Sequence, residues 1–81
     1  MSAVLKYFLA EEGDERFRSE FEDLIRDRIR VCAVFEFNEH TVTFDRETWK
    51  VEVWFRYGDP EVSIEVFGVD EFMIAIRQRR Q

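Results

Sequence analysis

The sequence predicts an α+β fold, in which a four-stranded antiparallel meander sheet is packed on one face by N-terminal helical segments and a C-terminal helix. Three observations predict it. Hydrophobic residues recur at helical spacing up to residue 30 and after residue 68, whereas they alternate at period two between residues 31 and 67. The connectors between the alternating runs are short, as hairpins require. With 81 residues, one proline and three glycines, we expect one domain over residues 1–81.

The first twelve residues favour a short helix. Its apolar residues have i, i+1, i+4, i+5 spacing and are Val4, Leu5, Phe8 and Leu9. Ser2 is a suitable cap and Gly13 a suitable terminator. An edge strand over residues 3–9 is the competing interpretation. The stripe lies roughly half a turn from the stripe of the next helix, which predicts a break at Gly13.

Residues 14–30 predict an amphipathic helix. Its apolar stripe is Phe17, Phe21, Leu24, Ile25 and Ile29. Asp14 is placed to cap the N-terminus, and arginines gather in the last turn, as the helix dipole favours. Arg28 falls inside the apolar stripe. Either its stem covers the core while the guanidinium reaches solvent, or it forms a buried pair with a sheet carboxylate.

The strand pattern assigns side chains to two faces of the sheet. The helix-covered face is expected to carry Phe35, Phe44, Trp49, Val53, Phe55 and Ile64. The opposite face is expected to carry Cys32, Val34, Glu36, Thr41, Thr43, Asp45, Lys50, Glu52, Trp54, Arg56, Ser63, Glu65 and Phe67. Helical spacing then returns in residues 69–80 and predicts the closing helix.

The residues that catalysis needs are few. His40 is the only histidine and Cys32 the only cysteine. Cys32 lies inside a predicted strand, where the role of a small buried hydrophobe is expected over that of a nucleophile. One imidazole beside one carboxylate, Glu39, provides too few ligands for zinc. We therefore expect neither an enzyme nor a metal site nor a cofactor.

The charge balance excludes other classes of function. The chain has 18 acidic and 12 basic residues, which disfavours direct binding of nucleic acid and of anionic membranes. No apolar run approaches the roughly 18 to 20 residues of a membrane span. The N-terminus lacks the pattern of a secretory signal, and a single cysteine gives no internal disulfide. We therefore expect a cytoplasmic protein.

Two surfaces remain as candidates for binding a protein partner. The first is the outer sheet face, where an exposed tryptophan among charges has the composition of an interaction hot spot. Its candidate residues are Trp54, Arg56, Glu52 and Phe67. Alternatively, Trp54 belongs to a small outer cluster, or the N-terminal segment covers it. The second surface is the acidic stretch 11–23, which is either a solvated helix face or a phosphate-like field. Its candidate residues are Glu11, Glu12, Asp14, Glu15, Glu20, Glu22 and Asp23.

These surfaces predict a small, acidic, non-catalytic inhibitor. It would bind a larger protein with a basic surface, of the kind that handles nucleic acid, and neutralise it. Inhibitors of nucleases and of restriction or CRISPR machinery, and toxin-immunity proteins, are analogous in size and charge alone. The alternative is a homo-oligomeric structural or scaffold module, a homodimer for example, that pairs through the exposed sheet face.

Overall fold

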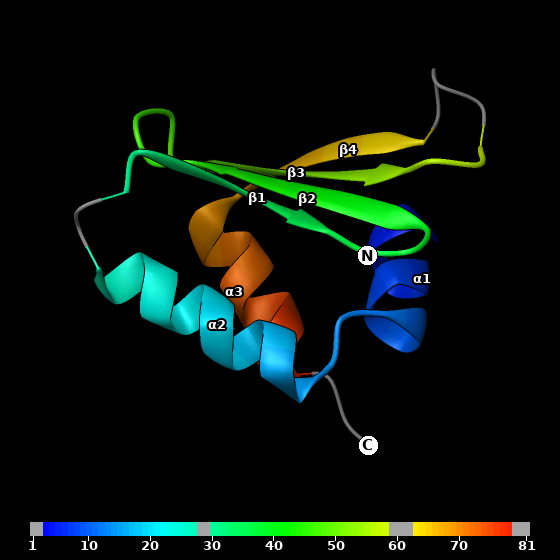
Figure 1. Cartoon of the computed structure of the whole chain (residues 1–81), viewed down its shortest axis with the longest axis horizontal. Coiled ribbons are helices and arrows are strands. Elements are labelled where there is room, and N and C mark those ends of the chain that lie inside the picture. Colours follow the sequence, from blue (N-terminus) through cyan, green and yellow to red (C-terminus); the bar gives the residue numbers. More distant parts are fainter. Residues whose placement is uncertain (1–2, 28–29, 59–62, 79–81) are drawn as a thin grey trace.

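The computed structural model describes residues 3–27, 30–58 and 63–78. Their elements follow the order α1 (Ala3–Glu11), α2 (Glu15–Arg26), β1 (Cys32–Glu36), β2 (His40–Asp45), β3 (Lys50–Phe55), β4 (Ile64–Gly68) and α3 (Val69–Gln78). All neighbouring strands are antiparallel and their order is β1-β2-β3-β4. Figure 1 shows the helices in one layer beneath the sheet and the other sheet face uncovered. The predicted α+β meander is confirmed.

The N-terminal segment is a helix, and the break after it lies at Gly13. The amide of Gly13 donates to the carbonyl of Phe8 at 2.7 Å and closes the last turn of α1. A Cβ at Gly13 would come within 2.8 Å of a ring carbon of Phe8, so a larger residue does not fit there. Asp14 then caps α2 by accepting the Phe17 amide at 3.0 Å, as expected.

Helix α2 is shorter than the sequence pattern predicted. It ends at Arg26, with Asp27 in extended conformation as the C-cap. Arg30 lies outside the helix, while Arg28 and Ile29 lie outside the described residues, and so does the expectation for Arg28.

Arg46, in the β2–β3 turn, caps the C-terminus of α2. Its Nη2 donates to the carbonyls of Leu24 at 2.8 Å and Asp27 at 2.5 Å, and its Nε donates to that of Arg30 at 2.6 Å. The last carbonyls of a helix have no intrahelical hydrogen-bond donor and carry partial negative charge. A guanidinium donates hydrogen bonds to them and its positive charge is attracted to them. This long-range cap fixes α2 against the sheet.

The core lies between the sheet and the helices. Cross-strand neighbours face the same side, and the rows Ala33–Phe44–Val51–Phe67 and Phe35–Val42–Val53–Glu65 face the helices. Several of these side chains are fully buried together with helix residues, namely Phe8, Phe21, Val42, Phe44, Val51, Val53, Val69 and Phe72. The predicted inward direction of Phe35, Phe44, Val53 and Phe55 is confirmed.

The predicted faces of β4 are wrong. Phe67 is opposite Val51 and is buried against Phe72, so it does not belong to the outer face. Ile64 is opposite Trp54 and points outward with it, 42% exposed. Ser63 is buried at 3%. The sequence pattern assigns the β-branched residues of this strand, such as Ile64, to the helix-covered face. In the structure the large ring of Phe67 fills the core space beneath β4, next to the start of α3, so the branched residues point outward.

Trp49 also differs from its prediction. It lies in the turn before β3, with a φ of 58° that is rare for a bulky residue. The side chain is 37% exposed, its ring edge contacts Phe44 at 5.9 Å between centroids, and its Nε1 donates to Asp70 Oδ1 at 3.4 Å. Trp49 therefore covers the end of the core without being a strand residue.

Candidate partner-binding surfaces

The uncovered side of the sheet, which we call the open face, carries Trp54. The outward-pointing residues of its strands are Cys32, Val34, Glu36, Thr41, Thr43, Asp45, Lys50, Glu52, Trp54, Ile64 and Val66. Trp54 is 39% exposed and stands beside Ile64, while Val34 and Val66 are each 57% exposed. In the described residues no helix lies over this face (Figure 1).

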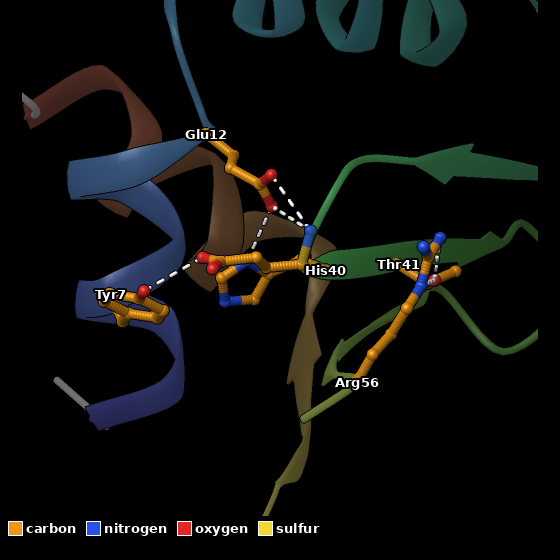
Figure 2. A network of polar contacts seen from close by, with 6 residues as sticks. Tyr7, Glu12, His40, Thr41 and Arg56 are labelled. Atoms are coloured by element: carbon orange, nitrogen blue, oxygen red, sulfur yellow. Dashed lines mark hydrogen bonds and ion pairs between the residues drawn. The ribbon is translucent and has the colours of Figure 1, made fainter. Parts of the chain in front are cut away.

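Arg56 lies beside Trp54, as the sequence suggested. Its Nε and Nη2 donate to the hydroxyl of Thr41 at 3.2 and 3.1 Å (Figure 2). Thr41 is the cross-strand neighbour of Trp54. The guanidinium is thus held half-buried at the border of the open face, next to the exposed indole.

Glu12 does not belong to an exposed acidic field. Its side chain is 11% exposed, and it accepts the backbone amide of Glu39 at 3.0 Å. Its Oε1 also lies 2.8 Å from Nδ1 of His40, as Figure 2 shows. A carboxylate can only accept, which places the proton on Nδ1. Glu12 therefore ties the end of α1 to the start of β2, and the expected role in an exposed field is wrong.

His40 lies at the centre of this contact between the end of α1 and the start of β2. It is completely buried as the first residue of β2, and its ring lies 5.3 Å from each of the rings of Tyr7, Phe8 and Phe55. Its Nε2 has no hydrogen-bond partner among the described residues. An imidazole enclosed by three aromatic rings has no access to a substrate. Sequence reasoning treated His40 only as a single imidazole beside Glu39 and missed its burial.

Tyr7 completes the connection between α1 and the β1–β2 hairpin. Its hydroxyl donates to Glu39 Oε1 at 2.9 Å. This hydrogen bond, and secondarily desolvation and the charges of Glu39, Glu11 and Glu12, raise the pKa of Tyr7 above its ordinary 10.0, because an ionised tyrosine cannot donate.

The remaining acids of α2 form ion pairs with neighbouring arginines. The pairs are Glu15 with Arg18, Glu20 with Arg16, Asp23 with Arg26 and Glu22 with Arg77 of α3. Most of these side chains are solvent-exposed, so each pair contributes little to stability. The negative field of α2 is therefore weaker than the count of acids suggests.

A groove of about 600 Å³ follows the β1 side of the molecule, and we call it the β1 groove. It is lined by Glu11, Glu12, Asp14, Arg16, Phe17, Glu20, Val34, Phe35, Glu36, Phe37 and Asn38. Acidic residues from α1, from the α1–α2 junction, from α2 and from β1 line this groove together with aromatic residues, and Arg16 is the basic residue among these lining residues. Sequence reasoning missed Glu36 as a member of this acidic set, although the first strand of a meander is necessarily a sheet edge.

The structure separates the two predicted surfaces. Trp54, Arg56 and Glu52 belong to the open face or its border, whereas α2 and its acids lie in the helix layer beneath the sheet (Figure 1). Val34 and Glu36 connect them, since both point outward and also line the β1 groove. Phe67, buried in the core, belongs to neither.

Cys32 is exposed, so its expected burial is wrong. Within residues 3–27, 30–58 and 63–78, no three His, Cys, Asp or Glu side chains gather closely enough to hold a metal ion. None of the helices in these ranges has the length and apolarity needed to cross a bilayer. Comparison with protein-family models, curated proteins and solved structures finds no match to the chain.

Proposed function

We propose that this chain is a non-catalytic binding protein that occupies, and so neutralises, a basic surface of a larger protein. A nucleic-acid-handling protein is the natural class of target, because its binding groove is basic and accepts a field of carboxylates in place of phosphates. The observation that supports this most is the β1 groove, whose described lining includes the acidic residues Glu11, Asp14, Glu20 and Glu36 and one basic residue, Arg16.

The charges of this groove act mainly on association. Net charge is −6, and a cluster of one sign around a concave surface steers an oppositely charged partner toward it. The half-buried aromatic side chains Phe35 and Phe37 supply apolar surface that a docked partner desolvates. Steering and burial together give a plausible basis for specific binding without any catalytic group.

Affinity capture from lysate of the source cells, with matched charge variants, tests this function. Glu11→Lys/Glu20→Lys neutralises the net charge of the described groove lining, and Glu47→Lys/Glu71→Lys makes the same change of net charge at two exposed positions outside the groove, in the β2–β3 turn and on α3. We expect the wild type and the control to retain a basic protein that salt elutes, and the groove variant to lose it. Equal capture by both variants would contradict the assignment to the groove.

Self-association is a second candidate function, and a different observation favours it. Trp54, Ile64 and Val66 form an exposed apolar group on the open face beside the β4 edge, which is unusual on a charged monomer. Sedimentation at micromolar concentration should then give a dimer that Val66→Lys dissociates. A monomer at both low and high salt would rule it out, since high salt screens the repulsion between acidic copies.

A further inference from the structure

The outer edge of β1 offers unpaired backbone groups. The Phe37 amide donates to the His40 carbonyl at 2.8 Å, and the Arg46 amide donates to the Val31 carbonyl at 2.7 Å. Hydrogen-bonded pairs alternate along antiparallel strands, so Ala33 and Phe35 also bond to β2. The N–H and C=O groups of Cys32, Val34 and Glu36 therefore point away from the sheet. In the described residues no strand pairs with that side of β1.

Charge surrounds this edge on both sides. On the helix side, the β1 groove brings Glu11, Asp14 and Glu20 alongside the strand. On the open face, the side chain of Glu36 stands at the same edge and Val34 is 57% exposed. Arg16 is held by Glu20 at 3.3 Å, and among the described lining residues no other basic side chain stands near the remaining carboxylates.

We infer that β1 is a strand-addition site, to which an extended segment of the partner pairs as a fifth strand and presents arginine or lysine at alternate positions. This inference rests on the proposed function and specifies that the basic surface of the partner includes an extended segment. Side chains of an added strand alternate between the faces. One set enters the β1 groove beside Glu11 and Asp14, while the other lies next to Val34 and Glu36.

Charge complementarity selects this occupant over a second copy of the chain. Pairing β1 with β1 of another copy would bring two acidic edges together, and like charges across adjacent strands are destabilising. Backbone hydrogen bonds supply affinity in strand addition, and the flanking side chains supply specificity. A basic segment satisfies both the unpaired backbone groups and the uncompensated carboxylates.

A pair of synthetic peptides separates backbone pairing from charge. The first alternates arginine with valine. The second has the same sequence but is N-methylated at the residues whose amides would face β1, so it keeps its charge and loses its donors. We expect the first to bind at least about tenfold more tightly, because several backbone hydrogen bonds are lost in the second. On binding, the amides of Val34 and Glu36 should gain protection from hydrogen exchange, whereas those of Ile64 and Val66 should not.

Variants of the chain provide the matching controls. Val34→Pro removes an outward-pointing amide without a bond to β2, which an edge strand tolerates. Val34→Pro should weaken binding of the first peptide at least about tenfold, and Glu36→Lys should weaken binding of both peptides. Glu47→Lys carries the same charge change as Glu36→Lys and should weaken neither beyond about twofold.

The outcomes distinguish this inference from the proposed function. Equal affinity of the two peptides, protection at Ile64 and Val66 in place of Val34, or no binding of the first peptide overturns strand addition. If these results occur while Glu11→Lys/Glu20→Lys still abolishes capture of a basic protein, the proposed function stands without strand addition. If capture is also unaffected, both fail.

Discussion

The two edges of the sheet differ in their side chains while presenting the same backbone pattern. The Phe55 amide donates to the Ser63 carbonyl at 2.9 Å, so Ile64, Val66 and Gly68 leave their backbone groups unpaired at β4, as the alternate residues of β1 do. Around β1 the flanking residues are acidic. Around β4 they are mostly apolar, with Val66 and Ile74 of α3 each 57% exposed, although Glu65 and Glu71 also lie there.

This difference shows how side chains decide what an unpaired edge accepts. Proteins protect sheet edges with charges, because an apolar edge pairs with other chains unselectively. At β1 the carboxylates repel another acidic chain and favour a basic one. At β4 the half-buried Glu65 points toward the helix layer, and an inward charge is also a known protection against pairing. The two edges are therefore suited to different partners.

The largest expected effect tests the sheet that supports both edges. Val53 is completely buried and faces the helices, whereas Val66 points to the open face. Val53→Asp should unfold the domain, since an unpaired buried charge costs several kcal/mol of a total stability of about 5 to 15 kcal/mol. Val66→Asp should keep a cooperative thermal transition by circular dichroism. A folded Val53→Asp would show that the register is wrong.

Next in size is the contrast between Phe67 and Trp54 next to the β4 edge. Phe67 is 7% exposed and packs on Phe72, so Phe67→Ala should lower the free energy of unfolding by about 3 to 5 kcal/mol. Trp54→Ala should lower it by less than about 1 kcal/mol, because the indole is partly exposed on a face without a covering helix. Urea denaturation measures both. The reverse order would place Trp54 in a core and Phe67 on the surface.

A smaller effect separates adjacent glutamates on the β1 side. Glu12→Ala leaves the Glu39 amide and the His40 imidazole without their acceptor, and we expect a loss of about 2 to 4 kcal/mol. Glu11 is exposed, and Glu11→Ala should change stability by less than about 0.5 kcal/mol. Denaturation of both variants at one pH gives the comparison. If both variants lose equally little stability, Glu12 is an exposed acidic residue like Glu11 and does not hold the Glu39 amide and His40.

Much of the fold was predictable from residue spacing. The change from helical to alternating periodicity located each element, and Gly13 and Asp14 located the α1–α2 junction. The faces of β4 were not predictable, because its branched residues and Phe67 compete for the same core space and only the packing of α3 decides. The end of α2 was also missed, since its cap comes from Arg46, which is distant in the sequence.

The candidate site was predictable in composition but not in arrangement. The face of the sheet that Trp54 and Arg56 occupy followed from alternation, whereas the sequence left open whether Trp54 is exposed or covered. The sequence did not predict which acidic side chains are free of contacts. Glu12 contacts His40, a residue 28 positions away, and the acids of α2 pair with nearby arginines. The β1 groove depends on how α2 packs beside an edge strand, and no local pattern encodes that distance.

The smallest effect concerns the pH dependence of the α1 contact on the β1 side. The hydrogen bond to Glu39 raises the pKa of Tyr7 above 10.0 in the folded protein. A raised folded pKa means that the contribution to stability is present below the unfolded pKa and is lost as pH rises through the folded pKa. Wild-type stability should therefore fall more steeply than that of Tyr7→Phe as the pH rises from about 9 through and beyond the ordinary tyrosine pKa of 10.0. Tyr57→Phe, which removes a tyrosine that is 72% exposed, should keep the wild-type slope. Urea midpoints across this range measure the difference. If Tyr7→Phe and wild type decline in parallel, Glu39 does not hold the Tyr7 hydroxyl, and the contact of Glu12 with His40 and the packing of Phe8 on Phe37 fix α1 to the hairpin without it.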